Sequence, residues 1–472
     1  MDEQGGIRTV TVRFEAAGSG EESLTWAQND VWQGMVATGK ATTLGGVHPM
    51  PPGTTVSEIA DLLRFIMSRH QALRTRLRLT DGPPRQVCSA TGEAALEIVE
   101  AGTDEPAAVA ENLKLRLEEQ PFDYEQDWPV RMAVVTVRGA ITHLVTVYLH
   151  LAVDGGGIAA VVADVAARDP RTGAPAGPIT AIQPLELARR QAQPAALRQS
   201  AASLRHLEHV LRVVSPNMLG LPKADRPAEY RKIRYTSPAT ALAVERIAGA
   251  HSIAPSSALL AMFALGLARH TQEGTVWTMV LVNNRFRPGL ADSACQLVQS
   301  SPCLIEVGGV SLATVLERTK RSLLQTYKSA YYDGRQFDAV VERVNRETGR
   351  KVDFCCYYND RLDGLAAAGD AALTGPEEPA GDDPLTGAER LTSALGLASW
   401  SEEHEHALPA VPMFFNVDHP PGALDFQVSF DTRYLEVEDM IAVVRGIEAA
   451  AVETALTPDA PTRVPLRAGQ PA

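Results

Sequence analysis

Hydrophobic and polar positions alternate in some parts of the chain and recur every three or four residues in others. The clean alternation over residues 7–14 predicts a strand, because successive side chains of a strand point to opposite faces. Residues 141–151, rich in β-branched and aromatic side chains, predict a second strand. Apolar residues then repeat at helical spacing from Ile158 to Val165. This stretch therefore predicts a strand that ends at His150, a tight turn over residues 155–157, and a helix that begins near Ile158.

The alternation within this strand assigns each side chain to a face. Thr146, Tyr148 and His150 point one way, whereas Leu149 points the other way, toward a core. Polar atoms thus gather on the face of His150. We expect this imidazole to lie where a cleft could use it.

Further elements carry start signals of their own. Thr55 and Glu58 form a capping box that opens a helix with an apolar stripe. Ser237 followed by Pro238 reads as an N-cap with proline at the first helical position. Residues 256–270 predict another helix, and residues 276–282 a strand that ends just before Asn283 and Arg285.

Length, composition and charge narrow the function classes. The chain has 472 residues, which favours two sizeable domains. A hydrophobic content of 45% and a charged content of 21% are typical of a soluble protein. A net charge of −13 argues against nucleic acid or an anionic membrane as partner. Neither a signal peptide nor an apolar run long enough to span a bilayer is indicated, so we expect a cytoplasmic location.

The cysteines indicate no disulfide framework. There are five, none of them in a CxxC pair, and Cys355 and Cys356 are neighbours inside an apolar run. We expect buried, reduced thiols.

The stretch around His150 resembles a known motif. His150, Asp154 and Gly155 match the second His, the Asp and the Gly of the HHxxxDG motif of nonribosomal peptide synthetase condensation domains. That superfamily also includes chloramphenicol acetyltransferase. Leu149 stands where the motif has its first His, and its place on the core-facing side of the strand makes this departure compatible with activity.

Other segments extend the resemblance from about residue 24 to residue 455. Residues 69–75, RHQALRT, resemble the family's RHExLRT motif with Gln71 in place of Glu, and we expect a structural role for His70. Residues 23–35 resemble the first motif of the family, with Thr25 at its serine position. Residues 121–131 resemble the segment upstream of the His motif, and residues 283–285 the segment with an Asn-Arg pair. Residues 336–338, 354–359 and 429–440 show looser matches.

The resemblance implies the fold class: an α/β protein of two chloramphenicol acetyltransferase-like lobes, each an α+β sandwich, arranged as a V-shaped pseudo-dimer. The first lobe would span residues 1–180 and carry the HxxxDG motif, and the second residues 181–472. The family pattern also pairs Asp154 with the arginine of the Asn-Arg motif, here Arg285, across the two lobes. Asp154 then serves the architecture of the site rather than acting as a base.

The chemistry of acyl transfer assigns roles to the remaining residues. His150 is the candidate catalytic residue, either as a general base or as a group that positions the acceptor or stabilises the tetrahedral intermediate. Gly155 to Gly157 precede a helix N-terminus, where free N–H groups favour negative charge. They either contact an oxyanion or only permit a tight turn and close packing.

Three functions stay open. The preferred one is a free-standing condensation enzyme of secondary metabolism, which joins an acyl or aminoacyl group on a carrier-protein phosphopantetheine thioester to an amine or hydroxyl acceptor. The second is a CoA-dependent O- or N-acyltransferase of the same superfamily. The third is a non-catalytic domain that recruits carrier proteins or other partners. None requires a bound cofactor or metal, since phosphopantetheine enters as substrate.

Two further segments have simple interpretations. Residues 189–214 predict an arginine-rich helix, whose exposed face is either merely solvated or docks an acidic carrier protein. His206 and His209 lie there without the further ligands that a metal site needs. Residues 360–410 form an acidic insert with His404 and His406, which we expect to be a solvated loop rather than a zinc site.

Overall fold

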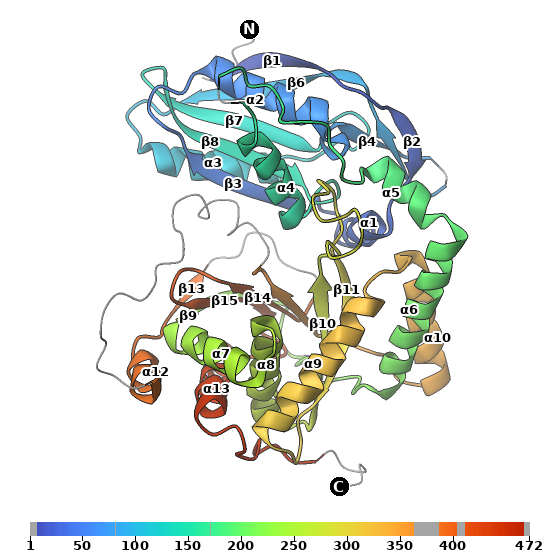
Figure 1. The fold of residues 1–472 in the computed structure, drawn as a ribbon, viewed down its shortest axis with the longest axis vertical. Coiled ribbons are helices and arrows are strands. Elements are labelled where there is room, and N and C mark those ends of the chain that lie inside the picture. The colour runs from blue at the N-terminus through green and yellow to red at the C-terminus, as the bar shows by residue number, and fades with distance from the viewer. Residues whose placement is uncertain (1–6, 81, 170, 363–386, 404–410, 467–472) are drawn as a thin grey trace. The chain divides into compact units, whose positions relative to one another are not determined.

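The computed structural model describes residues 7–80, 82–169, 171–362, 387–403 and 411–466 (Figure 1). Contacts divide the chain into two compact units. The first comprises Met1–Arg198, Asn283–Val298 and Asp333–Arg335, and the second comprises Gln199–Val282, Gln299–Tyr332 and Gln336–Ala472. The expected lobes, 1–180 and 181–472, stay a prediction. His404 and His406 lie outside the described residues.

The first unit is built on a five-stranded sheet with the order β1-β6-β7-β8-β3. Its strands are β1 (Ile7–Glu15), β3 (Thr43–Pro49), β6 (Thr91–Glu100), β7 (Val130–Val137) and β8 (Ala140–Leu149). Only the β6–β7 pair of this sheet is parallel in the described chain. A small three-stranded sheet, β2-β5-β4, adds β2 (Gly20–Ser23), β4 (Thr75–Arg78) and β5 (Arg85–Cys88).

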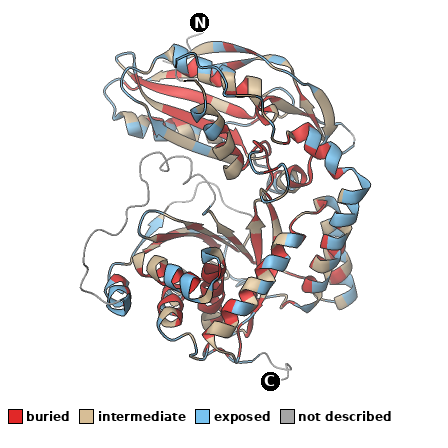
Figure 2. Ribbon diagram, in the orientation of Figure 1, coloured by how far each residue is buried: buried red, intermediate tan, exposed pale blue. Residues whose placement is uncertain are grey.

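Helices cover both faces of the five-stranded sheet, and its central strands are largely buried (Figure 2). Leu144 and Tyr148 of β8 pack in the cluster that includes Ile59 of α2. Val145 and Val147 face the opposite cluster, with α3. The helical elements of this unit are α1 (Trp26–Thr38), α2 (Val56–Arg69), the 3₁₀ turn η1 (Gln71–Arg74), α3 (Pro106–Glu119), α4 (Gly155–Ala166) and α5 (Pro184–Gln191).

The second unit holds a seven-stranded sheet with the order β11-β10-β12-β14-β15-β9-β13. Its strands are β9 (Tyr230–Ser237), β10 (Thr275–Val282), β11 (Gln299–Glu306), β12 (Cys356–Asp360), β13 (Ser399–Glu403), β14 (Met413–Asp418) and β15 (Leu424–Asp431). Strands β10, β12 and β14 run parallel to one another.

The apolar face of this sheet carries most of the second core. Phe263 of α8 contacts Tyr358 and Phe415, with ring centroids 5.0 Å and 4.9 Å apart. The helices after α5 are α6 (Pro194–Val213), α7 (Pro238–His251), α8 (Pro255–Thr271), α9 (Leu312–Ser329), α10 (Gly334–Thr348), α12 (Gly387–Leu395) and α13 (Val437–Leu456). No single described helix is long and apolar enough to cross a membrane, although α7 and α8 together, bent by 116°, pass the same test of length and composition.

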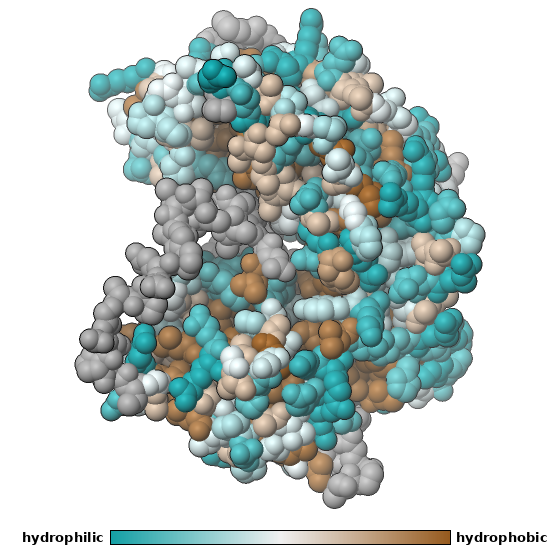
Figure 3. Space-filling model, viewed as in Figure 1, coloured by the Kyte–Doolittle hydropathy of each residue, from teal (hydrophilic) through white to brown (hydrophobic). Residues whose placement is uncertain are grey.

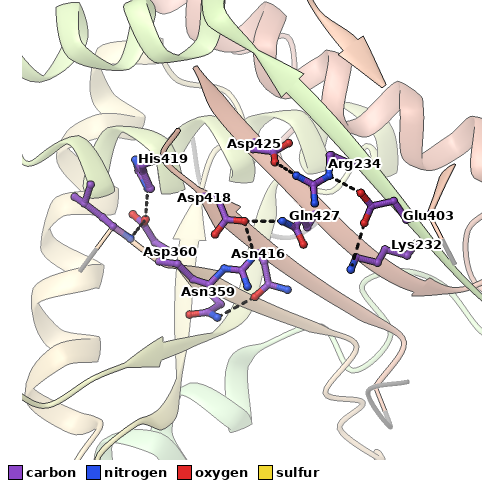
Figure 4. A network of polar contacts seen from close by, with 12 residues as sticks. Lys232, Arg234, Asn359, Asp360, Glu403, Asn416, Asp418, His419, Asp425 and Gln427 are labelled. Carbon is purple, nitrogen blue, oxygen red and sulfur yellow. Dashed lines mark hydrogen bonds and ion pairs between the residues drawn. The ribbon is translucent and has the colours of Figure 1, made fainter. Parts of the chain in front are cut away.

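The other face of the seven-stranded sheet is polar and its side chains are joined to one another (Figure 4). Asn359 donates to Asn416 over 2.9 Å, and Gln427 donates to Asp418 over 2.6 Å. Arg234 bonds Asp425 over 2.6 Å. These bonds link neighbouring strands, so the polar side chains of this face also stabilise the sheet.

Several predicted elements are confirmed. The capping box of Thr55 and Glu58 is present, and the Ser237 side chain caps α7. All five cysteines are buried and unpaired. The arginine-rich helix is instead two helices, because the proline at 194 opens a new helix, α6. The surface over α6 and α10 is mostly hydrophilic (Figure 3), and Glu208 there binds both Arg212 and Arg343.

We predict opposite effects of alanine at two helical glycines of the second unit. At Gly266 of α8 an added Cβ would lie 2.8 Å from the backbone nitrogen of Ile447, so Gly266→Ala should lower the free energy of unfolding by about 1–3 kcal/mol. At Gly249 of α7 no atom lies within 4 Å of that position, so Gly249→Ala should raise it by about 0.5–1 kcal/mol. Urea denaturation of the two variants checks this. Equal shifts would contradict the close approach of α8 and α13.

Candidate active site

His150 lies in the turn directly after β8 and is half-buried. Its backbone N–H donates to the carbonyl of Thr42 over 2.8 Å. Its Nδ1 lies 3.0 Å from the carbonyl oxygen of Val153. A carbonyl only accepts, so Nδ1 must carry the proton and Nε2 of the neutral ring keeps its lone pair. Nε2 has no partner among the described residues, so it is available to accept a proton.

Tyr148 is 6% exposed, and burial raises its pKa to about 12, opposed by a side-chain hydrogen bond with Thr146. Two of the three residues predicted to share a strand face therefore contact each other. The strand ends at Leu149, and His150 lies in the turn that follows, so its place on the same face stays a prediction.

The helix after the turn begins at Gly155 rather than near Ile158, so the prediction of a glycine turn before the helix is wrong. Asp154 is the N-cap, and its Oδ1 accepts from the N–H of Gly157 over 2.7 Å. This cap lets the glycines form the first turn of α4. The apolar repeat marks only where the helix acquires a buried face.

Asp154 is 1% exposed and fully engaged. Arg285 binds it in a bidentate manner, with NH2 2.6 Å from Oδ1 and NH1 3.0 Å from Oδ2. Oδ2 also accepts from the backbone N–H groups of Leu297 and Val298 over 2.8 Å and 3.1 Å. Both oxygens of this buried carboxylate are occupied by donors, so Asp154 builds the site.

Arg285 organises the segment around it. Its NH2 donates to the carbonyls of Ser293 and Cys295, both over 3.1 Å. The N–H of Gln296 donates to the carbonyl of Ala152 over 3.0 Å, inside the His150 turn. Although it follows β10 in the chain, Asn283–Val298 belongs by its contacts to the first unit. The pair of Asp154 and Arg285 thus lies within one unit, not across two as the resemblance implied.

The three glycines at positions 155–157 differ in how much space a side chain would have. A Cβ at Gly156 would lie 2.7 Å from the guanidinium carbon of Arg285, and one at Gly157 would lie 2.9 Å from the carbonyl oxygen of Cys295. Close packing therefore requires both. No atom lies within 4 Å of a Cβ at Gly155, so the space beside it is open. The N–H groups of Gly155 and Gly156 bond no described residue, as expected in the first turn of a helix.

Leu149 is buried, 5% exposed, as its predicted core-facing position requires. It packs in an apolar cluster with Leu24, Met35, Leu77, Phe122 and Leu151. A cavity of about 20 Å³ beside it, lined also by Gln28, has room for one water. Leucine therefore satisfies this position by packing alone.

His70 has the structural role that was expected. It is 3% exposed, and its Nε2 lies 3.1 Å from Oδ2 of Asp164 on α4. Arg69 donates to both oxygens of the same carboxylate, over 2.6 Å and 2.8 Å. Burial would raise the pKa of Asp164, but hydrogen bonds from His70 and Arg69 outweigh it and hold that pKa well below its usual range. These contacts fix α4 to α2.

Sequence reasoning missed several residues that shape the site. Asp164, Thr42 and the carbonyl of Val153 act through contacts that no motif marks. Asp164 lies on the polar side of the predicted helix, which is a weak signal. In the described ranges, no group of three or more His, Cys, Asp or Glu residues gathers as metal ligands would.

We predict that Asp154→Ala destabilises the protein by about 3–5 kcal/mol, because it leaves Arg285, 12% exposed, without its counter-charge. Thermal denaturation measures this. Asp61→Ala, which removes an exposed partner of Arg64, is the control and should shift stability by less than about 1 kcal/mol. Unchanged melting and unchanged turnover of Asp154→Ala would refute the role assigned to the pair.

Alanine at the first two glycines of α4 should separate packing from open space. Gly156→Ala should displace Arg285 and lower stability by about 1–3 kcal/mol. Gly155→Ala should leave stability within about 1 kcal/mol of the parent, since its Cβ meets nothing. Denaturation curves compare the two, and a larger loss at Gly155 would contradict the geometry.

Residues 47–352, more than half of the chain, match the family model of the condensation domain. The matched range includes the turn of His150 and the loop of Arg285. No curated protein matches the sequence.

Solved structures share the fold at low sequence identity. The first condensation domain of the calcium-dependent antibiotic synthetase, in complex with a substrate analogue, is 17% identical with a TM-score of 0.67, over 95% of this chain and 99% of that one. SgcC5 from Streptomyces globisporus is 18% identical with a TM-score of 0.65, over 93% and 100%. The X-domain from teicoplanin biosynthesis is 14% identical with a TM-score of 0.69, over 96% and 99%.

These likenesses confirm the expected fold class, a mixed α/β chain with the fold of a condensation domain. The family match rests on sequence, independently of the fold comparison, and it covers the residues that build the site. The chain belongs to the condensation-domain family.

Proposed function

We propose that the protein is an acyltransferase that joins an acyl or aminoacyl group, carried as a phosphopantetheine thioester, to an amine or hydroxyl acceptor. The observation that carries the proposal is the pinned imidazole of His150, whose Nδ1 donates to Val153 and whose Nε2 is unpartnered among the described residues. The turn that holds it is fixed by Asp154 and Arg285. Membership of the condensation-domain family supports the reaction class.

The reaction would proceed by attack of the acceptor on the thioester carbonyl. Nε2 of His150 accepts the proton of the attacking amine or hydroxyl as the new C–N or C–O bond forms. The carbonyl becomes an oxyanion, for which the N–H groups of Gly155 and Gly156 are the candidate backbone donors of the turn. Collapse of the tetrahedral intermediate breaks the C–S bond, and the proton passes to the departing thiolate.

A second role for His150 accounts for the same geometry. An imidazole that keeps its Nε2 lone pair can also accept a hydrogen bond from the acceptor and orient it, without taking the proton in the rate-limiting step. Both roles need the same tautomer, so both depend on the bond to Val153. A solvent isotope effect on turnover would distinguish them.

The donor is proposed to arrive on a carrier protein of another chain, with CoA as the alternative source. Among the similar solved structures, one is a holo four-domain nonribosomal peptide synthetase and another concerns condensation-domain-mediated chain release from the enacyloxin polyketide synthase. They are 15% and 18% identical to this chain, so they support the proposal only by analogy. A place in secondary metabolism and a cytoplasmic location belong to the same proposal.

Leu149 is the observation that favours the non-catalytic alternative, a domain that recruits partners. The family motif has a histidine there, and here the side chain is sealed in an apolar cluster. Against that alternative, the Nδ1 contact of His150 and the pairing of Asp154 with Arg285 are both present. A purely recruiting domain has no use for an imidazole held in one tautomer with Nε2 unpartnered among the described residues.

We predict that His150→Ala lowers the rate of product formation by roughly 10²–10⁴-fold, the usual contribution of a positioned acid or base. The assay follows coupling of a donor thioester to an amine or alcohol by mass spectrometry. His209→Ala, at an exposed position of α6, is the matched control and should be silent. Turnover near the parent rate in His150→Ala would remove the catalytic assignment.

The same assay identifies the donor. One acyl group is supplied on a carrier protein and on CoA, each with and without acceptor, and we expect the higher kcat/KM for the carrier-bound form. A higher value for CoA would favour the acyltransferase alternative. Binding of the carrier protein with no product from either donor would favour the recruiting domain.

A further inference from the structure

A second cleft lies in the first unit, near the C-terminal end of α3. It has a volume of about 280 Å³. Five charged side chains and one indole dominate its lining: Arg76, Glu93, Glu97, Asp127, Trp128 and Arg131. This is near the lower end of small-molecule pockets, so the cleft suits a ligand of few atoms.

Arg76 of β4 is the unusual group in this cleft. Its guanidinium carbon lies 3.5 Å from the ring centroid of Trp128, a close cation–π stack. Nε is buried without a hydrogen-bond partner, and in the part of the chain that the structure describes the guanidinium forms no hydrogen bond or ion pair. Burial lowers its pKa, opposed only by attraction to Asp127 and Asp123. Its donors are thus held in place and unused.

Arg131, in the same cleft, differs from Arg76 because its guanidinium donors have hydrogen-bond acceptors. It stacks on Phe122 at 3.5 Å and donates to the carbonyls of Leu117, Gln120 and Pro121 over 2.7, 2.6 and 2.7 Å. It also reaches Asp127 over 3.3 Å. Arg131 thus binds carbonyls at the C-terminal end of α3 and just after it, whereas Arg76 binds no carbonyl among the described residues.

The carboxylates of the cleft are only partly used. Glu93 binds Arg13 through Oε1, and Glu97 binds Arg116 through Oε2. Asp127 uses Oδ2 for Arg131 and for the N–H of Asp123. The second oxygen of each carboxylate has no partner among the described residues. The cleft therefore offers free anionic acceptors beside one free cationic donor.

We propose that this cleft binds a small zwitterion of the amino-acid type, with its carboxylate on Arg76 and its ammonium group among Glu93, Glu97 and Asp127. A simple anion would bind Arg76 but leave the free oxygens of the three carboxylates unused, and a simple amine would leave the guanidinium of Arg76 unused. At about 4 Å and an effective dielectric constant near 20, each pair of opposite charges is worth several kcal/mol before desolvation. A ligand that carries both a carboxylate and an ammonium group therefore binds better than one that carries only one of them. The proposal does not depend on the acyltransferase function, since it involves no residue of the His150 turn.

The indole of Trp128 provides the test. Its Nε1–H donates to the carbonyl of Glu93 over 2.8 Å, so its NMR signal reports on the cleft. The full chain is labelled with ¹⁵N-tryptophan and titrated at constant ionic strength with glycine, acetate or methylammonium. We expect glycine to shift the Trp128 signal saturably and at least roughly tenfold more tightly than either single-charge probe, while the other four indole signals stay in place.

Two variants decide whether Arg76 is the anchor. Arg76→Met keeps an apolar side chain over Trp128 but removes the donors, and it should weaken glycine binding roughly tenfold or more. Arg78→Met, on the same strand but bound to Glu21, should bind glycine as the parent does. Glu97→Gln should weaken glycine binding and leave the response to acetate unchanged or stronger.

Three results would overturn the proposal: no saturable shift with glycine, equal binding of glycine in Arg76→Met, or acetate binding as tight as glycine binding. The spectrum of each variant before titration shows whether it is folded. None of these measurements uses product formation. A failure of the cleft proposal can therefore be distinguished from a failure of the proposed acyltransferase function.

Discussion

The pairing of Asp154 with Arg285 is the interaction on which the geometry of this site depends. One carboxylate accepts two guanidinium bonds, caps α4 through Gly157 and binds the backbone of Leu297 and Val298. It therefore joins a strand end, a helix start and a distant loop at a single buried point. Because a buried carboxylate without its partners is strongly unfavourable, the three segments are fixed together or not at all.

Everything that gives His150 its chemistry follows from this fixed turn. The carbonyl of Val153, adjacent in sequence to the capping aspartate, holds Nδ1–H and so selects the tautomer. Gly156 and Gly157 let Arg285 and Cys295 approach α4 closely. Gly155, which touches nothing, is left facing open space with unused backbone donors beside it. The described residues thus provide an imidazole with one tautomer favoured, two backbone N–H donors and open space beside Gly155.

Much of the site could be predicted from the sequence because its signals are local. The strand before His150 and the buried position of Leu149 needed only alternation. The structural role of His70 followed from its place at a helix end, and the link between Asp154 and Arg285 came only from the family resemblance. The capping box of Thr55 and the N-cap of Ser237 were equally local. Each depends on residues a few positions apart, or on a resemblance carried by several such runs.

The rest depends on contacts between distant parts of the chain, which local patterns do not encode. The apolar repeat marks where α4 becomes buried, so it misplaced the helix start by the one turn that a side-chain cap supplies. The loop after β10 joins the first unit because its backbone amides find Asp154, not because of its composition. The stack of Arg76 on Trp128 joins residues far apart in sequence and has no motif at all.

The central claim is that the fold holds His150 with the proton on Nδ1 and a free lone pair on Nε2. The direct measurement is a long-range ¹H–¹⁵N correlation spectrum of the histidine rings, recorded at a pH where the His150 ring is neutral and assigned by comparison with His150→Ala. The account predicts a protonated, pyrrole-like Nδ1 and an unprotonated, pyridine-like Nε2. A His150 ring with its proton on Nε2, or one that exchanges freely between the two forms, would contradict it.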